Sequence, residues 1–468
     1  MSSSSVCRRA AHVALIPSAG MGHLAPFCRL AVALSDGGCD VSLLSAQPTV
    51  SAAESDRISA LFASFPRIRP LLLHLPPLHP SEFPPSADPF YLRYEMIRRS
   101  AHLLAPIFES SSLPISAVVI DIALASAVLP VVTANLGLKS YILFTTSASM
   151  LALYTYFPTY LDAAEPGSPI GDIDIPGLWR VPRASVVPAL HDADNLFTIQ
   201  FVSNGRALPQ ADGIIVNTFD AFEPEALAAL RAGKVTPSLP PVIAVGPLHP
   251  LGGSNSATPL QTQWLNEQPA GSVIYVSFGS RTAMSKAQIQ QLRRGIEVSG
   301  VRFLWVVKGK AVDREDDSEV EQLVGGDDEQ FLERVKGRGM VVKGWVEQER
   351  VLGHVSVGGF LSHCGWNSVA EAAVFGKPIL AWPRAADQRV NAAVAVACGL
   401  GMWVREWSWE AEEGVVSGEE IGKCIKELMA NEKLKASAVR VGEEAGRAIR
   451  ARGSSHEGLQ PLISSLNV

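Results

Sequence analysis

The chain has 468 residues, of which 47% are hydrophobic and 18% charged, and its formal net charge is −6. This length indicates roughly two or three domains with separate cores, and the composition is typical of a soluble globular protein. Because no basic block offsets the negative charge, the composition excludes a nucleic acid recognised through its phosphate backbone.

Cysteine usage and the hydrophobic segments indicate the compartment. The six cysteines are scattered without paired spacing, so we expect reduced thiols rather than disulfides or a metal site. The first apolar run is broken at Pro17 and lacks a signal-peptide core. The most membrane-like segment, 117–132, contains Asp121 and Pro130, and a buried strand and helix explain it better than a membrane span. We therefore predict a cytoplasmic protein without a membrane span.

The first half of the chain predicts a doubly wound parallel sheet. Residues 12–17 form a short apolar run, followed by a turn with Gly20 and Gly22 and then an apolar helical pattern. This order of strand, glycine turn and helix is how such a sheet begins. Further strands are predicted at 39–44, 71–75, 117–120, 140–144, 214–217 and 242–245.

Two stretches of this half predict other structure. Residues 91–108 predict a helix whose arginines, Arg93, Arg98 and Arg99, are expected to form a solvated basic face. Residues 158–194 contain frequent Pro, Gly and Asp with weak periodicity. We expect loops and short helices there, lying over a ligand pocket.

The second half repeats the architecture after a linker rich in Gly, Pro and Ser. Strands are predicted at 273–278, 303–307 and 341–342, helices at 419–430 and 433–450, and a solvated acidic loop at 313–329. We predict the following division of the chain: an N-terminal domain at 1–246, the linker at 247–261, a C-terminal domain at 262–450, and a final segment at 451–468 that packs back on the N-terminal domain.

The stretch 345–388 carries a ligand-binding pattern. It contains an apolar run, then HCGWNS, then an amphipathic run ending at Pro378, which predicts a strand, a tight turn, a helix and a further strand. Gly365 would let the backbone approach a ligand closely, and a helix starting near Asn367 and Ser368 would present unpaired N–H groups. This predicts a diphosphate site. The turn at Ser280, after the strand at 273–278, is expected to face the same phosphates.

Side chains at fixed offsets in this stretch complete a nucleotide-sugar site. Trp345 offers a flat face for a base, and Gln348 can pair with the polar edge of that base. His363 can donate a hydrogen bond to a phosphate oxygen. Glu371, about one helical turn beyond Asn367, can accept hydrogen bonds from two ribose hydroxyls.

From Trp345 to Gln388, with HCGWNS between, the stretch resembles the signature box of the plant family-1 UDP-glycosyltransferases. The alternative is an ordinary Rossmann-like turn with a buried Trp, which does not account for so long a motif. The resemblance covers nearly the full chain. It implies the GT-B fold, which is two Rossmann-like α/β domains facing a cleft, with UDP-glucose as co-substrate, no metal and no other cofactor. It also adds Val346 to the UDP-binding residues and Trp366 to the sugar-binding residues.

The end of the stretch supplies further sugar ligands. Asp387 and Gln388 offer a carboxylate and an amide, which can fix sugar hydroxyls. The family often has an aromatic residue and then a small or polar one before this pair, whereas Ala385 and Ala386 stand here. We expect a wider floor under the sugar, and the choice among glucose, galactose and xylose stays open, with Gln388 favouring glucose by resemblance.

His23 is the candidate catalytic base. It lies in the turn after the first strand, at the carboxyl edge of the sheet, and an imidazole can take a proton from a phenolic acceptor near neutral pH. The alternative is a histidine that only caps a helix, but IPSAGMGH resembles the turn that carries the family's catalytic His. Asp121 ends a predicted strand in the same half-sheet, where it can orient the imidazole or, alternatively, cap the next helix. Thr145 resembles a family position whose hydroxyl reaches the sugar, with helix capping as the alternative.

Segments throughout the first half resemble the branch of the family that makes flavonoid C-glucosides from 2-hydroxyflavanones and dihydrochalcones. They are PSAGMGHLAPF, SADPFYLRYEMIRRSA, VIDIALASAVLPV and DADNLFTIQFVSNGRAL. The pair Asp121-Ile122 resembles the Asp-Ile pair associated there with C-transfer, so Ile122 is the candidate for acceptor selectivity. The resemblance implies a single displacement that inverts the α-linked donor to a β-C-glucoside.

Three alternatives stay open. An O-glucosyltransferase acting on flavonoids or other phenols would use the same residues. A protein that binds a UDP-sugar without transferring it would share the fold, but retention of His23 and Asp121 counts against it. A nucleotide-sugar epimerase shares the fold type and lacks the resemblance at Trp345. We expect a monomer whose partners are small molecules.

Overall fold

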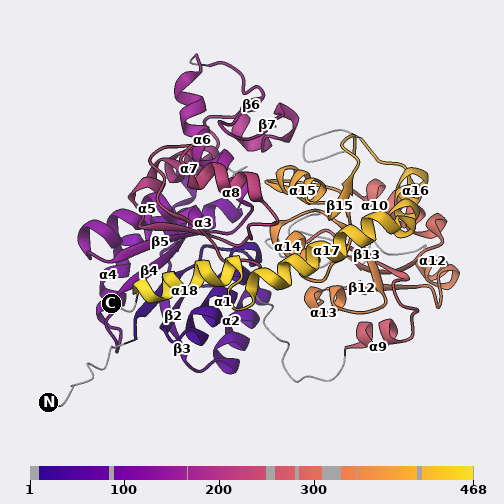
Figure 1. Cartoon of the computed structure of the whole chain (residues 1–468), viewed down its shortest axis with the longest axis horizontal. Helices are drawn as coiled ribbons and strands as arrows, with labels where there is room; N and C mark the ends of the chain where they lie inside the picture. The colour runs from indigo at the N-terminus through magenta and orange to yellow at the C-terminus, as the bar shows by residue number, and fades with distance from the viewer. Residues whose placement is uncertain are drawn as a thin grey trace.

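The computed structural model of the chain (Figure 1) describes residues 10–83, 89–165, 167–248, 259–279, 284–307, 328–344, 346–407 and 414–466. Two parallel sheets, each covered by helices, lie side by side, as the purple and orange halves of Figure 1 show. This is the predicted arrangement of two Rossmann-like α/β domains. No helix among the residues so described is long and apolar enough to cross a bilayer.

The N-terminal sheet has seven parallel strands in the order β3-β2-β1-β4-β5-β8-β9. Its strands are β1 (His12–Ile16), β2 (Asp40–Gln47), β3 (Ile68–His74), β4 (Ala117–Asp121), β5 (Lys139–Phe144), β8 (Gly213–Val216) and β9 (Val242–Ala244). Successive residues of β1 enter the two cores on opposite faces of the sheet, Val13 and Leu15 on one side and Ala14 and Ile16 on the other. Burial on both faces is why these strands are continuous apolar runs rather than alternating ones.

Helices cover both faces of this sheet. They are α1 (Met21–Asp36), α2 (Ala52–Ser64), α3 (Pro89–Arg99), α4 (Leu104–Glu109), α5 (Ala125–Pro130), α6 (Ala148–Ala163), α7 (Leu196–Ala207) and α8 (Pro224–Arg231). Short helical turns join them: η1 (Pro80–Glu82), η2 (Ala101–Leu103), η3 (Ile122–Leu124), η4 (Val131–Asn135), η5 (Arg183–Ser185), η6 (Pro188–His191) and η7 (Leu208–Gln210).

The C-terminal sheet has six parallel strands in the order β12-β11-β10-β13-β14-β15. They are β10 (Val273–Ser277), β11 (Arg302–Val307), β12 (Gly339–Lys343), β13 (Val357–Ser362), β14 (Ile379–Ala381) and β15 (Gly401–Trp403). The helices are α9 (Leu260–Asn266), α10 (Lys286–Ser299), α12 (Asp328–Arg334), α13 (Gln348–Leu352), α14 (Trp366–Val374), α15 (Gln388–Ala397), α16 (Gly418–Ala430), α17 (Glu432–Ile449) and α18 (Ser454–Leu466).

The last two helices run from one domain to the other (Figure 1). Ala438 and Val441 of α17 belong to a core of the C-terminal domain, whereas Leu462 and Ile463 of α18 belong to the N-terminal core that contains Val13 and Leu15. The Lys139 ammonium of β5 donates to the Ser465 carbonyl over 2.9 Å. The domain boundaries predicted from the sequence stay predictions, and most of the linker at 247–261 lies outside the described residues.

Each sheet reverses direction once. From β1 the chain adds β2 and β3 on one side and then returns to place β4 on the other, and in the second sheet β13 returns beside β10 in the same way. Loops at the carboxyl ends of the two central strands diverge there and leave room for a ligand. His23 follows β1 and Asp121 ends β4, so the first reversal places the two predicted catalytic residues at one edge.

Three expectations on local structure need correction. The helix predicted at 91–108 is interrupted at Ser100, whose hydroxyl donates to the Met96 carbonyl over 2.8 Å. In 158–194, where loops and short helices were expected, strands β6 (Ile173–Asp174) and β7 (Arg180–Val181) also form an antiparallel pair. Strand β15 was not predicted, because its three residues are too few to show a period. Most of the acidic stretch 313–329 lies outside the described residues.

The predicted basic face on α3 is also wrong. Arg98 points inward and donates to the Asn204 side-chain oxygen over 2.9 Å and to the Ser126 hydroxyl over 3.0 Å. Arg93 lines a small cavity, and only Arg99 is well exposed, where it pairs with acidic neighbours. Helical periodicity alone did not reveal this, because an arginine can bury its stem and satisfy its guanidinium on partners far along the chain.

Candidate active site

The centre of the site is a hydrogen bond between His23 and Asp121. His23 Nδ1 lies 2.9 Å and 3.1 Å from the two carboxylate oxygens. The Asp121 side chain is fully buried, whereas the imidazole of His23 is 24% exposed. With the carboxylate oxygens as acceptors, Nδ1 is the donor of this pair, and in that tautomer Nε2 is the acceptor nitrogen of the imidazole. The arrangement can therefore accept a proton from a ligand while Asp121 stabilises the resulting imidazolium.

Asp121 also caps the next helical turn, as its alternative interpretation predicted. Its Oδ1 accepts from the backbone N–H of Ala123 over 2.9 Å, at the start of η3. The carboxylate therefore has partners on the backbone and on the imidazole, and these hydrogen bonds offset the cost of burying it. The residue after it, Ile122, is 4% exposed and belongs to the core that contains Phe90 and Tyr94.

Thr145 follows β5 and reaches the same imidazole. Its hydroxyl oxygen lies 3.2 Å from His23 Nδ1. It does not cap α6, because the cap is Ser147, whose hydroxyl accepts from the Met150 N–H over 3.1 Å. The capping alternative for Thr145 is therefore wrong. Its predicted contact with the sugar stays a prediction.

An aromatic wall on α3 and α7 lies beside His23, and the sequence analysis missed it. The rings of His23 and Tyr94 meet edge to face, with centroids 5.5 Å apart and planes at 72°. Phe90 packs on Tyr94 at 4.6 Å and Tyr91 on Phe197 at 5.1 Å. The spacing of 90, 91 and 94 on one face of a helix was the signal that could have revealed it.

The turn that presents His23 depends on glycine at position 20. Gly20 has φ 92° and ψ 147°, a backbone region essentially confined to glycine. A Cβ there would lie 2.6 Å from the ring of Phe90. The Gly20 carbonyl accepts from the N–H groups of His23 and Leu24 over 3.1 Å and 2.9 Å, which starts α1. The strained turn therefore fixes where the imidazole enters the site.

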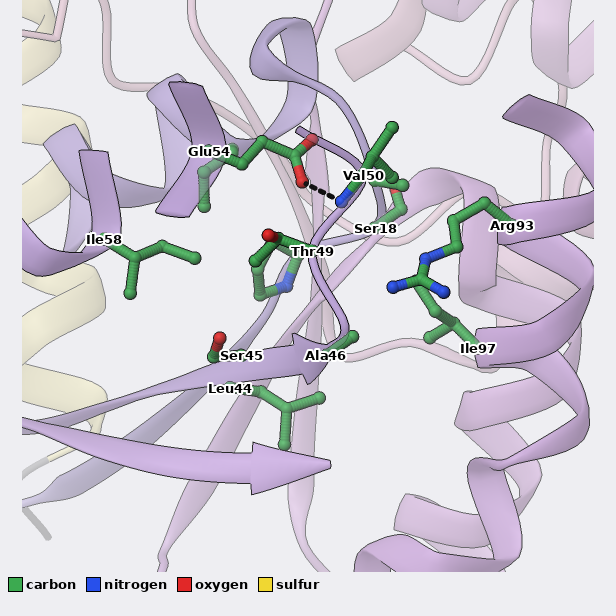
Figure 2. A pocket seen from close by; sticks show the side chains of 13 residues that line it. Ser18, Leu44, Ser45, Ala46, Thr49, Val50, Glu54, Ile58, Arg93 and Ile97 are labelled. Carbon is green, nitrogen blue, oxygen red and sulfur yellow. Dashed lines mark hydrogen bonds between the residues drawn. The ribbon is translucent and has the colours of Figure 1, made fainter. Parts of the chain in front are cut away.

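The buried carboxylate of Glu54 also stabilises this turn through hydrogen bonds. Glu54 on α2 is 6% exposed and accepts from the N–H groups of Gly20 and Val50, the second over 3.1 Å (Figure 2). Glu54 and Arg93 lie on opposite sides of a cavity of about 20 Å³, which has room for one water molecule. Burial lowers the pKa of the Arg93 guanidinium, and the charge of Glu54 opposes that shift.

The predicted phosphate turn lies between β13 and α14, as the sequence indicated. The helix begins at Trp366, one residue before Asn367. The left-handed residue is Cys364, with φ 63°, whereas Gly365 has an ordinary φ of −57°. Gly365 therefore does not need a left-handed conformation, and the expectation that it lets the backbone approach a ligand closely stays a prediction. A Cβ on Gly365 would lie 2.6 Å from His363 Nε2, so its role is to leave space for that ring.

His363 lies between two glycines. A Cβ on Gly279, the residue after β10 and Phe278, would lie 2.5 Å from the same Nε2 atom. Gly279 has φ 76°. The imidazole thus fills the space at the carboxyl ends of β10 and β13, where the second sheet reverses. Ser280, the neighbouring predicted phosphate ligand, and Trp345, the predicted base platform, lie outside the described residues.

Gln348, Ser368 and Glu371 lie together, as a shared nucleotide site requires. Gln348 Nε2 donates to the Glu371 carboxylate over 2.7 Å and to the Ser368 hydroxyl over 3.0 Å. The other Glu371 oxygen accepts from Arg29 of α1, a residue that the sequence analysis did not single out. Val346 is buried in the C-terminal core, so its side chain contributes to packing there.

The predicted sugar ligands lie where the two domains meet. The Asp387 carboxylate accepts from the Thr146 hydroxyl and, over 2.8 Å, from the Asn391 side-chain N–H group. The Gln388 side-chain oxygen accepts from the N–H groups of residues 384 and 385 over 2.7 Å and 2.9 Å. Trp366 donates its indole N–H to the Asn217 carbonyl over 2.8 Å. Because the indole N–H is already bonded, Trp366 would contact a sugar through its backbone.

A direct contact joins the two turns. The Asn367 side-chain N–H donates to the Gly22 carbonyl over 3.0 Å, so the predicted phosphate turn touches the turn that carries His23. The residues of the predicted donor site and of the predicted base are thereby brought together. No group of three His, Cys, Asp or Glu side chains in the described parts of the chain is arranged to hold a metal ion.

Comparison with known proteins identifies the family. The sequence profile described as UDP-glucoronosyl and UDP-glucosyl transferase matches residues 236–443. UDP-glycosyltransferase CGT of Oryza sativa subsp. indica is 56% identical over 460 residues, which span 97% of this chain and 96% of that protein. The chain belongs to the plant family-1 UDP-glycosyltransferases. Another relative of this UDP-glycosyltransferase is UDP-glycosyltransferase 708A6 of Zea mays, 52% identical over 97% of this chain and 95% of that protein.

A solved structure extends the comparison to the fold. The crystal structure of LpCGTa in complex with UDP has a TM-score of 0.87 with this UDP-glycosyltransferase and 46% sequence identity, and it covers 98% of this chain and 100% of that one. The predicted family and the predicted GT-B fold are thus confirmed, and a UDP-sugar is the co-substrate. The roles assigned to single residues of the site stay predictions.

Substitution of Gly20 by alanine tests the turn. In G20A the added Cβ meets Phe90 and the backbone strain costs about 1–3 kcal/mol, so His23 shifts and kcat/KM for sugar transfer should fall about 10–100-fold. Gly22 is the matched control, because a Cβ there has no atom within 4 Å in the described structure. G22A should transfer at nearly the wild-type rate. Equal rates for the two variants in a coupled UDP-release assay would contradict this role of Gly20.

Proposed function

We propose that this UDP-glycosyltransferase is an inverting C-glucosyltransferase. It transfers glucose from UDP-glucose to a ring carbon of a flavonoid-type polyphenol, such as a 2-hydroxyflavanone or a dihydrochalcone. The observation that carries the proposal is the buried Asp121 carboxylate, held on His23 Nδ1 at 2.9 Å and followed directly by the buried Ile122. A relative at 56% identity and a solved structure at 46% identity, both with CGT in their names, support it.

The reaction is a single displacement. His23 Nε2 takes the proton of a phenolic hydroxyl, which places negative charge on the oxygen and on the ring carbons beside it. A ring carbon attacks C1 of glucose from the face opposite the diphosphate; the C–C bond forms as the bond from C1 to the phosphate oxygen breaks. The α-linked donor therefore gives a β-C-glucoside. UDP leaves, and loss of the proton from the attacked carbon restores the aromatic ring.

The donor side receives the departing charge. The first turn of α14 presents N–H groups and the positive end of the helix dipole to the diphosphate, and the imidazole of His363 lies beside that turn. Gln348 and Glu371 hold the base and the ribose, and Asp387 and Gln388 hold the sugar. Ser280, Trp345, Asn367 and Ser368 complete the donor site in the predicted roles.

The acceptor side is aromatic. Tyr94 meets the catalytic imidazole edge to face, and Phe90, Tyr91 and Phe197 continue that wall. Phe90 and Tyr94 are buried, so a planar polyphenol stacks on the half-buried rings of Tyr91 and Phe197, and Ile122 places an apolar side chain next to Asp121. A ring carbon can then face the sugar. We expect the enzyme to work in the cytoplasm as a monomer.

An O-glucosyltransferase is the second candidate, because the same His23–Asp121 pair can deliver an oxygen nucleophile. Incubation with UDP-glucose and phloretin, followed by heating of the product in acid, separates the two. We expect a glucoside that survives, because a C–C bond resists acid hydrolysis, with a β configuration by NMR. Return to the aglycone would establish O-transfer and overturn the proposed bond. Hydrolysis of UDP-glucose without any glucoside would point to a different acceptor.

Substitution of Asp121 by asparagine tests the base. Asparagine retains an oxygen that can cap Ala123, but it no longer offers a carboxylate to Nδ1–H, so the imidazole loses its orientation and its counter-charge. We expect kcat to fall by about 10²–10⁴ with a normal thermal unfolding midpoint. H23A should lose a similar factor, and the double variant should lose little more than either. Activity of D121N within about threefold of wild type would contradict the pairing.

Exchange of Ile122 tests the choice of atom. I122T introduces a hydroxyl of similar bulk beside the base, which can hold the phenolate oxygen toward the sugar. We expect the product ratio to shift from C-glucoside to O-glucoside, whereas the matched variant I122V should retain C-glucoside. The measurement is the acid-stable fraction of product by liquid chromatography. An unchanged ratio in I122T would remove Ile122 from the explanation.

A further inference from the structure

Arg29 connects the two halves of the site. It lies on α1, the helix that carries His23, and its side chain is 3% exposed. One terminal nitrogen of the guanidinium donates to a carboxylate oxygen of Glu349 on α13 and to one of Glu371 on α14. A buried cation of the N-terminal domain thus holds two carboxylates of the C-terminal domain, the buried Glu371 and the partly buried Glu349.

The charges explain why an arginine is needed there. Two carboxylates side by side, one buried and one partly buried, repel each other and are costly to desolvate unless a cation lies between them. Burial raises the pKa of Glu349, and Arg29 opposes that shift. Burial alone would lower the pKa of the Arg29 guanidinium, but Glu371 and Glu349 raise it above its ordinary value. The positive charge is therefore permanent.

Hydrogen bonds from the described residues leave the Glu371 carboxylate with acceptor positions for a ligand. Arg29 donates to Oε1, and Gln348 Nε2 donates to Oε2 over 2.7 Å. A carboxylate oxygen has two acceptor positions, and within the described residues Arg29 and Gln348 occupy one on each oxygen and leave one on each. The predicted ligands of Glu371 are two ribose hydroxyls. The remaining acceptor positions match them in number, and their directions depend on how Arg29 and Gln348 fix the rotation of the carboxylate.

We propose that Arg29 is a positioning residue for the donor nucleotide. It holds the Glu371 carboxylate in the rotation that meets the two ribose hydroxyls, and it ties that carboxylate to the helix of the catalytic base. The inference rests on the donor site of the proposed function, with Glu371 as the ribose ligand. It does not depend on the acceptor or on the bond that is formed.

The test measures how strongly the full-length protein prefers UDP over 2′-deoxy-UDP and 3′-deoxy-UDP, by calorimetric titration without acceptor. In the wild type we expect each missing hydroxyl to weaken binding about 10–100-fold, as for a hydrogen bond to a charged acceptor. In R29M the preference should fall below about threefold, mainly through weaker binding of UDP. An unchanged preference would overturn the proposal. An equal loss of affinity for all three nucleotides would also overturn it, because Arg29 would then act only through domain packing.

E349Q is the matched control. It removes charge from the other partner of Arg29 and leaves the contact with Glu371, so most of the preference for UDP should survive. A loss as large as in R29M would overturn the route through Glu371. If R29M does not fold, as judged by its thermal unfolding, R29K carries the test. The lysine ammonium retains the positive charge but lacks the rigid, forked geometry of the guanidinium. The preference of R29K for UDP over the deoxy analogues should therefore lie between those of R29M and the wild type. A preference in R29K as strong as in the wild type would overturn the positioning role.

The outcome is separable from that of the proposed function. A wild-type protein that prefers UDP over its deoxy analogues but forms no C-glucoside would overturn the proposed bond and leave the role of Arg29 intact. A wild-type protein that binds all three nucleotides equally would overturn the role of Arg29 whatever glucoside it makes.

Discussion

The rest of the structure depends on a carboxylate buried next to an imidazole. A buried Asp121 is tolerable only because its oxygens have partners, the Ala123 N–H and His23 Nδ1. His23 reaches Asp121 because β1 and β4 are parallel neighbours, with Ile16 opposite Ile120, whereas Ala123 lies only two residues further along the chain. The glycine turn, the buried Glu54 behind it and the aromatic wall beside it all serve to hold the imidazole where that hydrogen bond can form. The strand order of the sheet thus determines the geometry of the predicted catalytic pair.

The remainder of the site is assembled by polar contacts between the domains. Arg29 reaches Glu371, the Asn367 amide reaches the Gly22 carbonyl, and the Thr146 hydroxyl reaches Asp387. Each contact joins an element near the base to an element near the donor. Polar contacts of this kind fix orientation more than they add stability, because each replaces hydrogen bonds to water. The relative placement of the predicted sugar site and the predicted base therefore depends on a few side chains rather than on one continuous core.

The sequence predicted those parts of the site that depend on residues close together in the chain. Apolar runs indicated the strands, and the ends of those strands indicated His23 and Asp121. The resemblance at 345–388 indicated the donor side, where Gln348 and Glu371 do lie together. Arg29 was not predictable, because a single arginine in an apolar helix pattern looks like its solvent-facing residue, and its partners lie more than 300 residues away. The left-handed conformation of Cys364 was equally hidden, because a residue other than glycine rarely adopts it.

The course of the C-terminal helices limits how the domains can move. The chain passes from the N-terminal to the C-terminal domain between Leu248 and Pro259, and it returns between α17 and α18, where Leu462 and Ile463 pack into the first domain. The chain therefore joins the two domains at two points along its length. Sliding of one domain past the other would pull Leu462 and Ile463 out of the first core, so the packing of α18 opposes it.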